Sequence, residues 1–419
     1  MNASVSLSHH TLDIEQPSLQ PTDELLAAAK QHILFTANRP DIVMARGEGM
    51  MIYDTEGKGY LDFIGGWAVN SLGHSPAVLQ EALARQASQL VHASPGFYNE
   101  PQVKFAELLC QVSGMDKVFF ASTGAEANES AVKLARKHGA LHLDGACEII
   151  TLTNSFHGRT LAMMSATGKP QWGPLFAPKV DGFIHVPIND LDACFAAVTN
   201  RTCAIMVELV QGEGGVHALS EAYLYGLRKI CDMYGILLIF DEVQTGLGRT
   251  GKLFAYEHYG IQPDILTLGK GIGAGFPLSA MLTKARFDLF QPGDQGGTYT
   301  GQPLGMAAGL AVLQELLERD LAASADKHGH ELISRLEELT ATYPITDVRG
   351  KGLLIAFDVP EGMAPKLASA CMERGLLINA TRASTIRLMP ALIVQTQHIE
   401  AMVSILRLAF DHLLSSHDG

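Results

Sequence analysis

Between residues 118 and 268, short apolar segments alternate with helical ones, and this alternation constrains the fold more than any other feature. The apolar segments have the length of strands and cover residues 118–120, 148–152, 203–209, 236–240 and 265–268. Helical patterns lie between them at residues 125–138, 191–198 and 221–234. This order predicts an α/β fold with a mainly parallel sheet and helices on both faces. Ligands of such sheets bind beyond the carboxyl ends of the strands.

The segment at residues 265–268 leads to a single lysine, Lys270, and glycines follow at positions 271, 273 and 275. The segment does not alternate as a half-exposed strand does, so we expect it to be buried. A lysine held on a poorly hydrated element can lose its proton and attack a carbonyl carbon. Taken alone, the segment fits equally a strand end with an exposed lysine and a flexible turn.

A second strand, at residues 236–240, ends in the acidic residue Asp241. A carboxylate at a buried strand end is costly unless a cation or a donor meets it, so Asp241 is a candidate partner for a protonated ring nitrogen. Val243 is placed to pack on a ring face and Gln244 to donate to a phenolic oxygen. The alternative is an aspartate that caps the next turn.

Small residues stand between the strand at 118–120 and the following helix, among them Gly124 and Ala125. At a helix N-terminus they leave amide groups free to hold a phosphate, although an ordinary N-cap at Ser122 or Thr123 explains them nearly as well.

Aromatic and charged residues follow two further strands. Phe156 is able to stack on a planar cofactor and Arg159 to bind a carboxylate with two hydrogen bonds. His157, between them, also fits a satisfied core residue. Glu208 and the distant Arg387 both lie in apolar surroundings, and if both are buried we expect them to pair.

Composition limits the class of protein. The chain has 419 residues, of which 47% are hydrophobic and 18% charged, which is typical of a globular protein. Its net charge of −13 argues against binding nucleic acid or an anionic membrane. We find no membrane-spanning stretch, no secretory signal and no metal site, since His138 and His142 lack a third ligand. Six widely spaced cysteines suggest reduced thiols and therefore the cytoplasm.

Taken together, these residues resemble those of the class III (ω-amino acid) aminotransferases that depend on pyridoxal phosphate. The resemblance runs from about Ile33 to the last helix, and several specific blocks occur in one order. The blocks at residues 53–58, 97–102, 254–257 and 375–380 are most similar to acetylornithine aminotransferases of arginine biosynthesis.

The resemblance implies a pyridoxal-phosphate-dependent transferase fold of the type I aminotransferase kind. It has a large domain with a mainly parallel sheet, and a smaller α/β domain built from both chain ends. We expect residues 1–28 to form a mobile N-terminal arm, residues 29–72 and 319–419 the small domain, and residues 73–318 the large, cofactor-binding domain.

The resemblance also implies roles for the cofactor-binding residues. Lys270 bonds covalently to the cofactor and moves a proton, and Asp241 keeps the pyridine nitrogen protonated. Gln244 holds the ring oxygen, while Phe156 covers the ring. Gly124 and Ala125 bind the phosphate together with Thr298 of the partner subunit in a homodimer whose active sites lie at the interface.

For the substrate, the resemblance implies that Arg159 binds the carboxylate remote from the reacting amine. Arg387, paired with Glu208, becomes free when glutamate or 2-oxoglutarate enters. Gly297 removes a serine that usually touches substrate, and Trp67 replaces a common isoleucine near the same pocket.

The predicted activity is transfer of the δ-amino group of N2-acetylornithine to 2-oxoglutarate, which gives N-acetylglutamate 5-semialdehyde and glutamate. Other ω-aminotransferases of the class, which use succinylornithine, ornithine or 4-aminobutyrate, remain alternatives. So do an aminomutase or epimerase of the same fold, and a binding or regulatory protein that keeps the fold and cofactor but not the activity.

Overall fold

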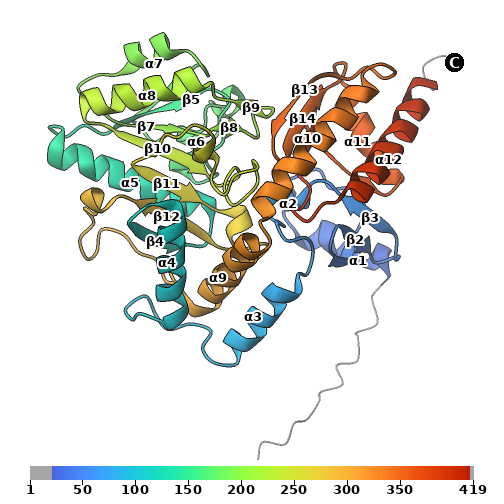
Figure 1. Ribbon diagram of the computed structural model, residues 1–419, viewed down its shortest axis with the longest axis horizontal. Coiled ribbons are helices and arrows are strands. Elements are labelled where there is room, and N and C mark those ends of the chain that lie inside the picture. The colour runs from blue at the N-terminus through green and yellow to red at the C-terminus, as the bar shows by residue number, and fades with distance from the viewer. Residues whose placement is uncertain (1–20, 416–419) are drawn as a thin grey trace, which may run out of the picture.

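A seven-stranded sheet forms the centre of the larger part of the molecule. The computed structural model describes residues 21–415. The sheet has the order β4-β12-β11-β10-β7-β5-β6 (Figure 1). Its strands are β4 (Lys117–Ala121), β5 (Glu148–Leu152), β6 (Phe183–Val186), β7 (Thr202–Val207), β10 (Leu237–Glu242), β11 (Ile265–Leu268) and β12 (Ser279–Thr283). Neighbours from β6 to β11 run parallel, and only β12 is antiparallel to the strands beside it. The prediction of a mainly parallel sheet is confirmed.

Both faces of this sheet are buried, because successive residues of its strands enter different hydrophobic clusters. In β10, Leu238 and Phe240 pack in the cluster that contains α8 (Glu221–Tyr234). Leu237 and Ile239 pack in the cluster that contains α5 (Gly124–His142). A strand with helices on both sides has no polar face, which explains its continuous apolar sequence.

The remaining helices of this part are α3 (Ala77–Ala87), α4 (Glu100–Ser113), α6 (Leu161–Ala166), α7 (Leu191–Ala197) and α9 (Pro303–Glu318). α3 and α4 both pack against α9.

Several strand limits differ from the sequence-based expectation. β10 continues two residues further than predicted, since Asp241 and Glu242 pair with Thr267 and Leu268 of β11. β6 and β12 were not predicted, and the strand expected at residues 203–209 ends at Val207.

The smaller part contains two four-stranded sheets. One has the order β1-β2-β3-β15 and joins β1 (Met44–Glu48), β2 (Met51–Asp54) and β3 (Gly59–Asp62) to β15 (Leu376–Leu377). The other joins β13 (Thr346–Lys351), β14 (Leu354–Asp358), β17 (Thr385–Leu388) and β16 (Asn379–Arg382). Parallel pairing of β15 with β3 brings both chain ends into one sheet, as predicted.

Helices α10 (Leu321–Leu339), α11 (Met363–Glu373) and α12 (Thr396–Ser415) lie beside these sheets (Figure 1). The predicted arm at residues 1–28 lies mostly outside the described residues, and α1 (Thr22–His32) occupies its end. The three boundaries between the predicted segments, after residues 28, 72 and 318, remain a proposal. Short elements complete the described chain, namely α2 (Gly65–Ala68), β8 (Val210–Gln211), β9 (His217–Ala218) and four 3₁₀ turns. Among residues 21–415, no helix is long and apolar enough to span a bilayer.

Candidate active site

A cavity of about 240 Å³ lies beside the ends of β7, β10 and β11 and the start of α5. Nine of the residues singled out in the sequence line it, namely Gly124, Ala125, Phe156, Arg159, Glu208, Asp241, Val243, Gln244 and Lys270. These residues come from segments up to 146 positions apart (270 − 124), so the parallel sheet assembles them.

Lys270 follows β11 and begins a short 3₁₀ turn with a left-handed backbone, at φ 47°. Burial lowers the pKa of its ammonium group, and the nearby Arg387 lowers it further. Glu213, Asp241 and Glu208 oppose this shift, and the resulting pKa is about 8. A lysine with such a pKa is neutral in about a tenth of the molecules at pH 7, far more than a lysine of ordinary pKa, and nucleophilic attack requires this neutral form.

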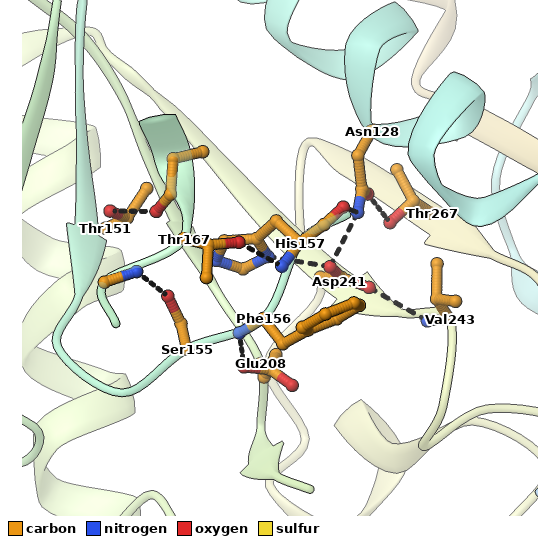
Figure 2. A network of polar contacts seen from close by, with 12 residues as sticks. Asn128, Thr151, Ser155, Phe156, His157, Thr167, Glu208, Asp241, Val243 and Thr267 are labelled. Carbon is orange, nitrogen blue, oxygen red and sulfur yellow. Dashed lines mark hydrogen bonds and ion pairs between the residues drawn. The ribbon is translucent and has the colours of Figure 1, made fainter. Parts of the chain in front are cut away.

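Asp241 is fixed by three N–H donors (Figure 2). Its Oδ2 accepts hydrogen bonds from Nδ1 of His157 at 2.7 Å and from Nδ2 of Asn128 at 2.8 Å, and its Oδ1 accepts one from the amide of Val243 at 3.0 Å. Asn128 is itself held, because its Oδ1 accepts from the Thr267 hydroxyl at 2.7 Å. The carboxylate therefore has one orientation, defined by α5, β10, β11 and the loop after β5.

The His157 side chain is fully buried against Asp241. Burial alone would lower the pKa of His157, but the hydrogen bond and the charge of Asp241 outweigh it, and the pKa is raised. The cationic form is thus favoured, which compensates the buried carboxylate. Figure 2 shows the Phe156 side chain extending beside Asp241.

The predicted pair of Arg387 and Glu208 is wrong. Arg387 instead donates from Nη2 to Oε1 of Glu213 at 2.8 Å. Glu208 accepts from the backbone amide of Phe156 at 2.9 Å, and burial raises its pKa to about 7. The path of the chain explains this choice of partner. Glu208 follows β7 directly and stays beside Phe156, whereas β8 and the turn after it bring Glu213 to Arg387 on β17.

Arg159 lies at an aromatic wall of the cavity. Its guanidinium carbon is 5.9 Å from the ring centre of Phe156 and 5.1 Å from that of Trp172. The ammonium of Lys169 stands 5.1 and 5.2 Å from the same two ring centres. Two cations therefore share one aromatic surface, a favourable arrangement for binding a carboxylate.

Four predicted residues do not line this cavity in the described chain, namely Arg387, Trp67, Gly297 and Thr298. Trp67 is 58% exposed, and only its backbone approaches the site, through a 3.4 Å hydrogen bond from Gln244. Gly297 and Thr298 are exposed, and the Thr298 carbonyl contacts His92.

Sequence reasoning did not single out Asn128, Glu213 or Lys169. Asn128 had a detectable signal, because it follows Gly124 by four residues and therefore shares its helix face. Glu213 stands alone between glycines after a strand, but nothing in the sequence separates it from Glu208.

The residues present fit pyridoxal phosphate. Gly124 approaches the cavity so closely that a Cβ there would stand 2.6 Å from Cγ1 of Val243, so only glycine leaves the α5 N-terminus open to a phosphate. An oriented carboxylate, an aromatic ring and a lysine complete the set that this cofactor requires. Within residues 21–415, no cluster of three or more potential ligands suits a metal ion.

Comparisons with known proteins agree with this chemistry. The family model of class III aminotransferases matches residues 35–410. An acetylornithine aminotransferase from Caldanaerobacter subterraneus is 44% identical over 384 residues, which is 91% of this chain and 98% of that protein.

Among solved structures, the ornithine aminotransferase from Toxoplasma gondii superposes with a TM-score of 0.91 at 31% identity, over 95% of this chain and 97% of that one. The acetylornithine aminotransferase from Elizabethkingia anophelis gives 0.84 at 33% identity, over 94% and 100%.

Proposed function

Because this chain belongs to the class III aminotransferases, enzymes that use pyridoxal phosphate, we propose that it transfers the δ-amino group of N2-acetylornithine to 2-oxoglutarate. The products would be N-acetylglutamate 5-semialdehyde and glutamate, as in arginine biosynthesis. The similarity to relatives named acetylornithine aminotransferases, 43–48% identical, supports this substrate pair.

The observation that carries the proposal is the presence of two different arginines around Lys270. Arg159 is exposed on the aromatic wall, whereas Arg387 is fully buried and covered by Glu213. An ω-amino acid has one carboxylate far from its reacting amine, and Arg159 is suited to bind that carboxylate. A dicarboxylate has a second carboxylate beside the reacting carbon, and Arg387 would bind that second carboxylate. One cavity can then accept both substrates in turn.

The charges beside Arg159 favour an acylated donor over free ornithine. The α-ammonium of ornithine would lie next to the carboxylate that Arg159 binds, where Lys169 adds a second positive charge on the same rings. The nearby carboxylate of Glu213 is already shared by two cations. An uncharged acylamino group avoids this repulsion. The high TM-score with an ornithine aminotransferase nevertheless makes ornithine the second candidate.

The chain's own residues would then act as follows. Bound pyridoxal phosphate supplies an aldehyde and an electron-accepting ring. The amides of Gly124 and Ala125 would hold its phosphate, and Asp241 would face the ring nitrogen. Phe156 and Val243 would flank the ring, Gln244 would hold its oxygen, and Nζ of Lys270 would bond to the cofactor and move the proton of the reacting carbon.

We also propose a homodimer in which Thr298 of the partner subunit completes the phosphate site. Exposed aromatic residues around the loop at residue 298 support it, with Phe97, Tyr98 and Tyr299 at 72%, 92% and 67% exposure. A cavity of about 610 Å³, lined in part by Tyr98 and Thr300, adjoins this surface. Apolar exposure on this scale is typical of an interface.

A cytoplasmic location stays a prediction, supported by six free cysteines.

The decisive experiment compares amino donors with purified holoprotein and 2-oxoglutarate. We expect kcat/KM to be highest for N2-acetylornithine or N2-succinylornithine and lower for ornithine and 4-aminobutyrate. A clear preference for either of the last two would contradict the substrate assignment, and turnover without any keto acid would indicate a mutase or epimerase instead.

A further inference from the structure

One carboxylate that lines the cavity, that of Glu213, bridges two cations. Its Oε1 accepts from Nη2 of Arg387 at 2.8 Å, and its Oε2 lies 3.3 Å from Nζ of Lys169. Burial would raise the pKa of Glu213, but the charges of Arg387 and then Lys169 outweigh it and lower the pKa to about 2. Glu213 is therefore ionised at every pH at which the protein would work.

The two cations differ in how firmly they are held. The Arg387 side chain is 1% exposed, and it also donates to Oδ1 of Asn379 at 2.9 Å and to Oε1 of Gln244 at 3.4 Å. Its position is thus fixed by neutral acceptors even without Glu213. Lys169 is 15% exposed, and its ammonium lies over the rings of Phe156 and Trp172. Its flexible four-carbon stem can adjust to a partner that moves.

This asymmetry matters if Glu213 leaves Arg387. A carboxylate that loses its only partner in a partly buried site carries a large desolvation cost. Glu213 has a second partner already in contact, so it can leave Arg387 without becoming an unpaired charge. Arg387 would meanwhile keep Asn379 and Gln244 and exchange one carboxylate for another.

We infer that Lys169 is a positioning residue that receives Glu213 when the carboxylate of a dicarboxylic substrate takes Arg387. This inference rests on the proposed function, since it assumes a dicarboxylate as the second substrate. It assigns Lys169 to the exchange between the two substrates, not to chemistry at the reacting carbon.

The test uses unreactive ligands and calorimetry on the holoenzyme. Glutarate has the two carboxylates of the proposed acceptor but no amino or keto group, and pentanoate has only one carboxylate. We expect Lys169→Met to weaken glutarate binding by about tenfold and to change pentanoate binding less than about twofold. Lys169→Arg, which keeps the charge, should restore most of the glutarate affinity.

Lys179 offers a matched control, because its Nζ donates to the Trp172 carbonyl at 2.7 Å and so ties the same loop. Lys179→Met should bind both ligands as the wild type does. The inference is overturned if Lys169→Met leaves glutarate affinity unchanged, if it weakens both ligands equally, if Lys179→Met has the same effect, or if the wild type does not bind glutarate.

Failure of the proposed substrate is separable from failure of this inference. Absorbance changes of the holoenzyme with glutamate alone and with N2-acetylornithine alone report the two half-reactions. A wild type that reacts with glutamate but not with N2-acetylornithine contradicts the donor assignment. The glutarate comparison then still tests Lys169.

Discussion

Two carboxylates of the same cavity, Asp241 and Glu213, are held in opposite ways. The Asp241 side chain is 3% exposed and accepts three hydrogen bonds, two of them from side chains that are themselves buried. The Glu213 side chain is 30% exposed, and among residues 21–415 its ion pairs are those with the two cations Lys169 and Arg387. One carboxylate has a single orientation and the other is shared by two cations.

The cavity thus has two ends, a fixed end at Asp241 and an exchangeable end at Glu213. This difference matches what each end must do. A cofactor is the same in every turnover, so its partner is best preorganised. Under the proposed function, two substrates with different carboxylates would alternate at the Glu213 end, where a fixed partner would suit only one of them. The loop that carries Glu213 has glycines on both sides, and Gly215 has a left-handed backbone at φ 110°. Those glycines give Glu213 more backbone freedom than Asp241 has within β10.

The largest effect is expected from the residue that both ends share. Lys270→Ala should lower both half-reactions by about 10⁴-fold or more, because no other described lysine lines the cavity. Steady-state turnover measures the loss. Borohydride reduction and peptide mapping should find the pyridoxyl group at residue 270 of the wild type, and finding it elsewhere would contradict the site. Lys252→Ala, at an exposed lysine, serves as the control.

Asp241→Asn tests the fixed end. The change keeps the shape but removes the charge that faces His157 and, as proposed, the cofactor ring nitrogen. We expect both half-reactions to fall together, by about 10²–10³-fold. The measurement is kcat/KM for each half-reaction, with the absorbance spectrum of the bound cofactor as a second readout. If activity fell with only one of the two substrates, Asp241 would act on that substrate and not on the cofactor that both half-reactions share.

The pH dependence of cofactor binding tests how both carboxylates act on Lys270. The covalent bond to the aldehyde requires neutral Nζ, and the pKa of Lys270 is lowered from 10.5 to about 8. Reconstitution of the apoprotein, followed by absorbance, should therefore speed up about tenfold per pH unit below pH 8 and level off above it. Glu213→Gln should lower this midpoint at least as much as Asp241→Asn, because Glu213 is the strongest of the opposing charges. A midpoint near 10.5 would contradict the buried environment.

The contrast between the two ends also explains how far sequence reasoning reached. Asp241 and Lys270 were predictable because each follows a continuous apolar run in the sequence, so local pattern alone brings them to one edge of the sheet. Asn128 completes the same end from a helix face whose spacing was readable. β12 was not predictable, since its five residues Ser279–Thr283 are ordinary in composition and become a strand by pairing with both β11 and β4.

At the other end, the sequence contained the right residue types but not their pairing. Glu208 and Glu213 are five positions apart, and Arg387 is more than 170 residues from both. The choice between them depends on the path of the chain through β8 and on contacts between β17 and the glycine loop. Such long-range packing leaves no local pattern.

Glu213→Gln tests the exchangeable end, where the expected effect is smallest and most selective. Removing the charge uncovers Arg387, so glutamate no longer has to displace a carboxylate. The uncovered guanidinium would also repel the ammonium of an ω-amino donor. We therefore expect the ratio of kcat/KM for N2-acetylornithine to that for glutamate to fall by about tenfold, with little change in protein stability. The two half-reactions, measured separately by absorbance, give this ratio.

Glu208→Gln is the matched comparison, because Glu208 lines the same cavity but accepts from the Phe156 amide, and forms no hydrogen bond or ion pair with Arg387. Its substitution acts on the Phe156 side of the cavity, so both half-reactions should change by similar factors and the ratio should stay near that of the wild type. If Glu208→Gln changed the ratio and Glu213→Gln did not, Glu208 would be the residue that controls Arg387. The carboxylate that substrate displaces from Arg387 would then be that of Glu208, and the proposed difference between a fixed Asp241 and an exchangeable Glu213 would fail.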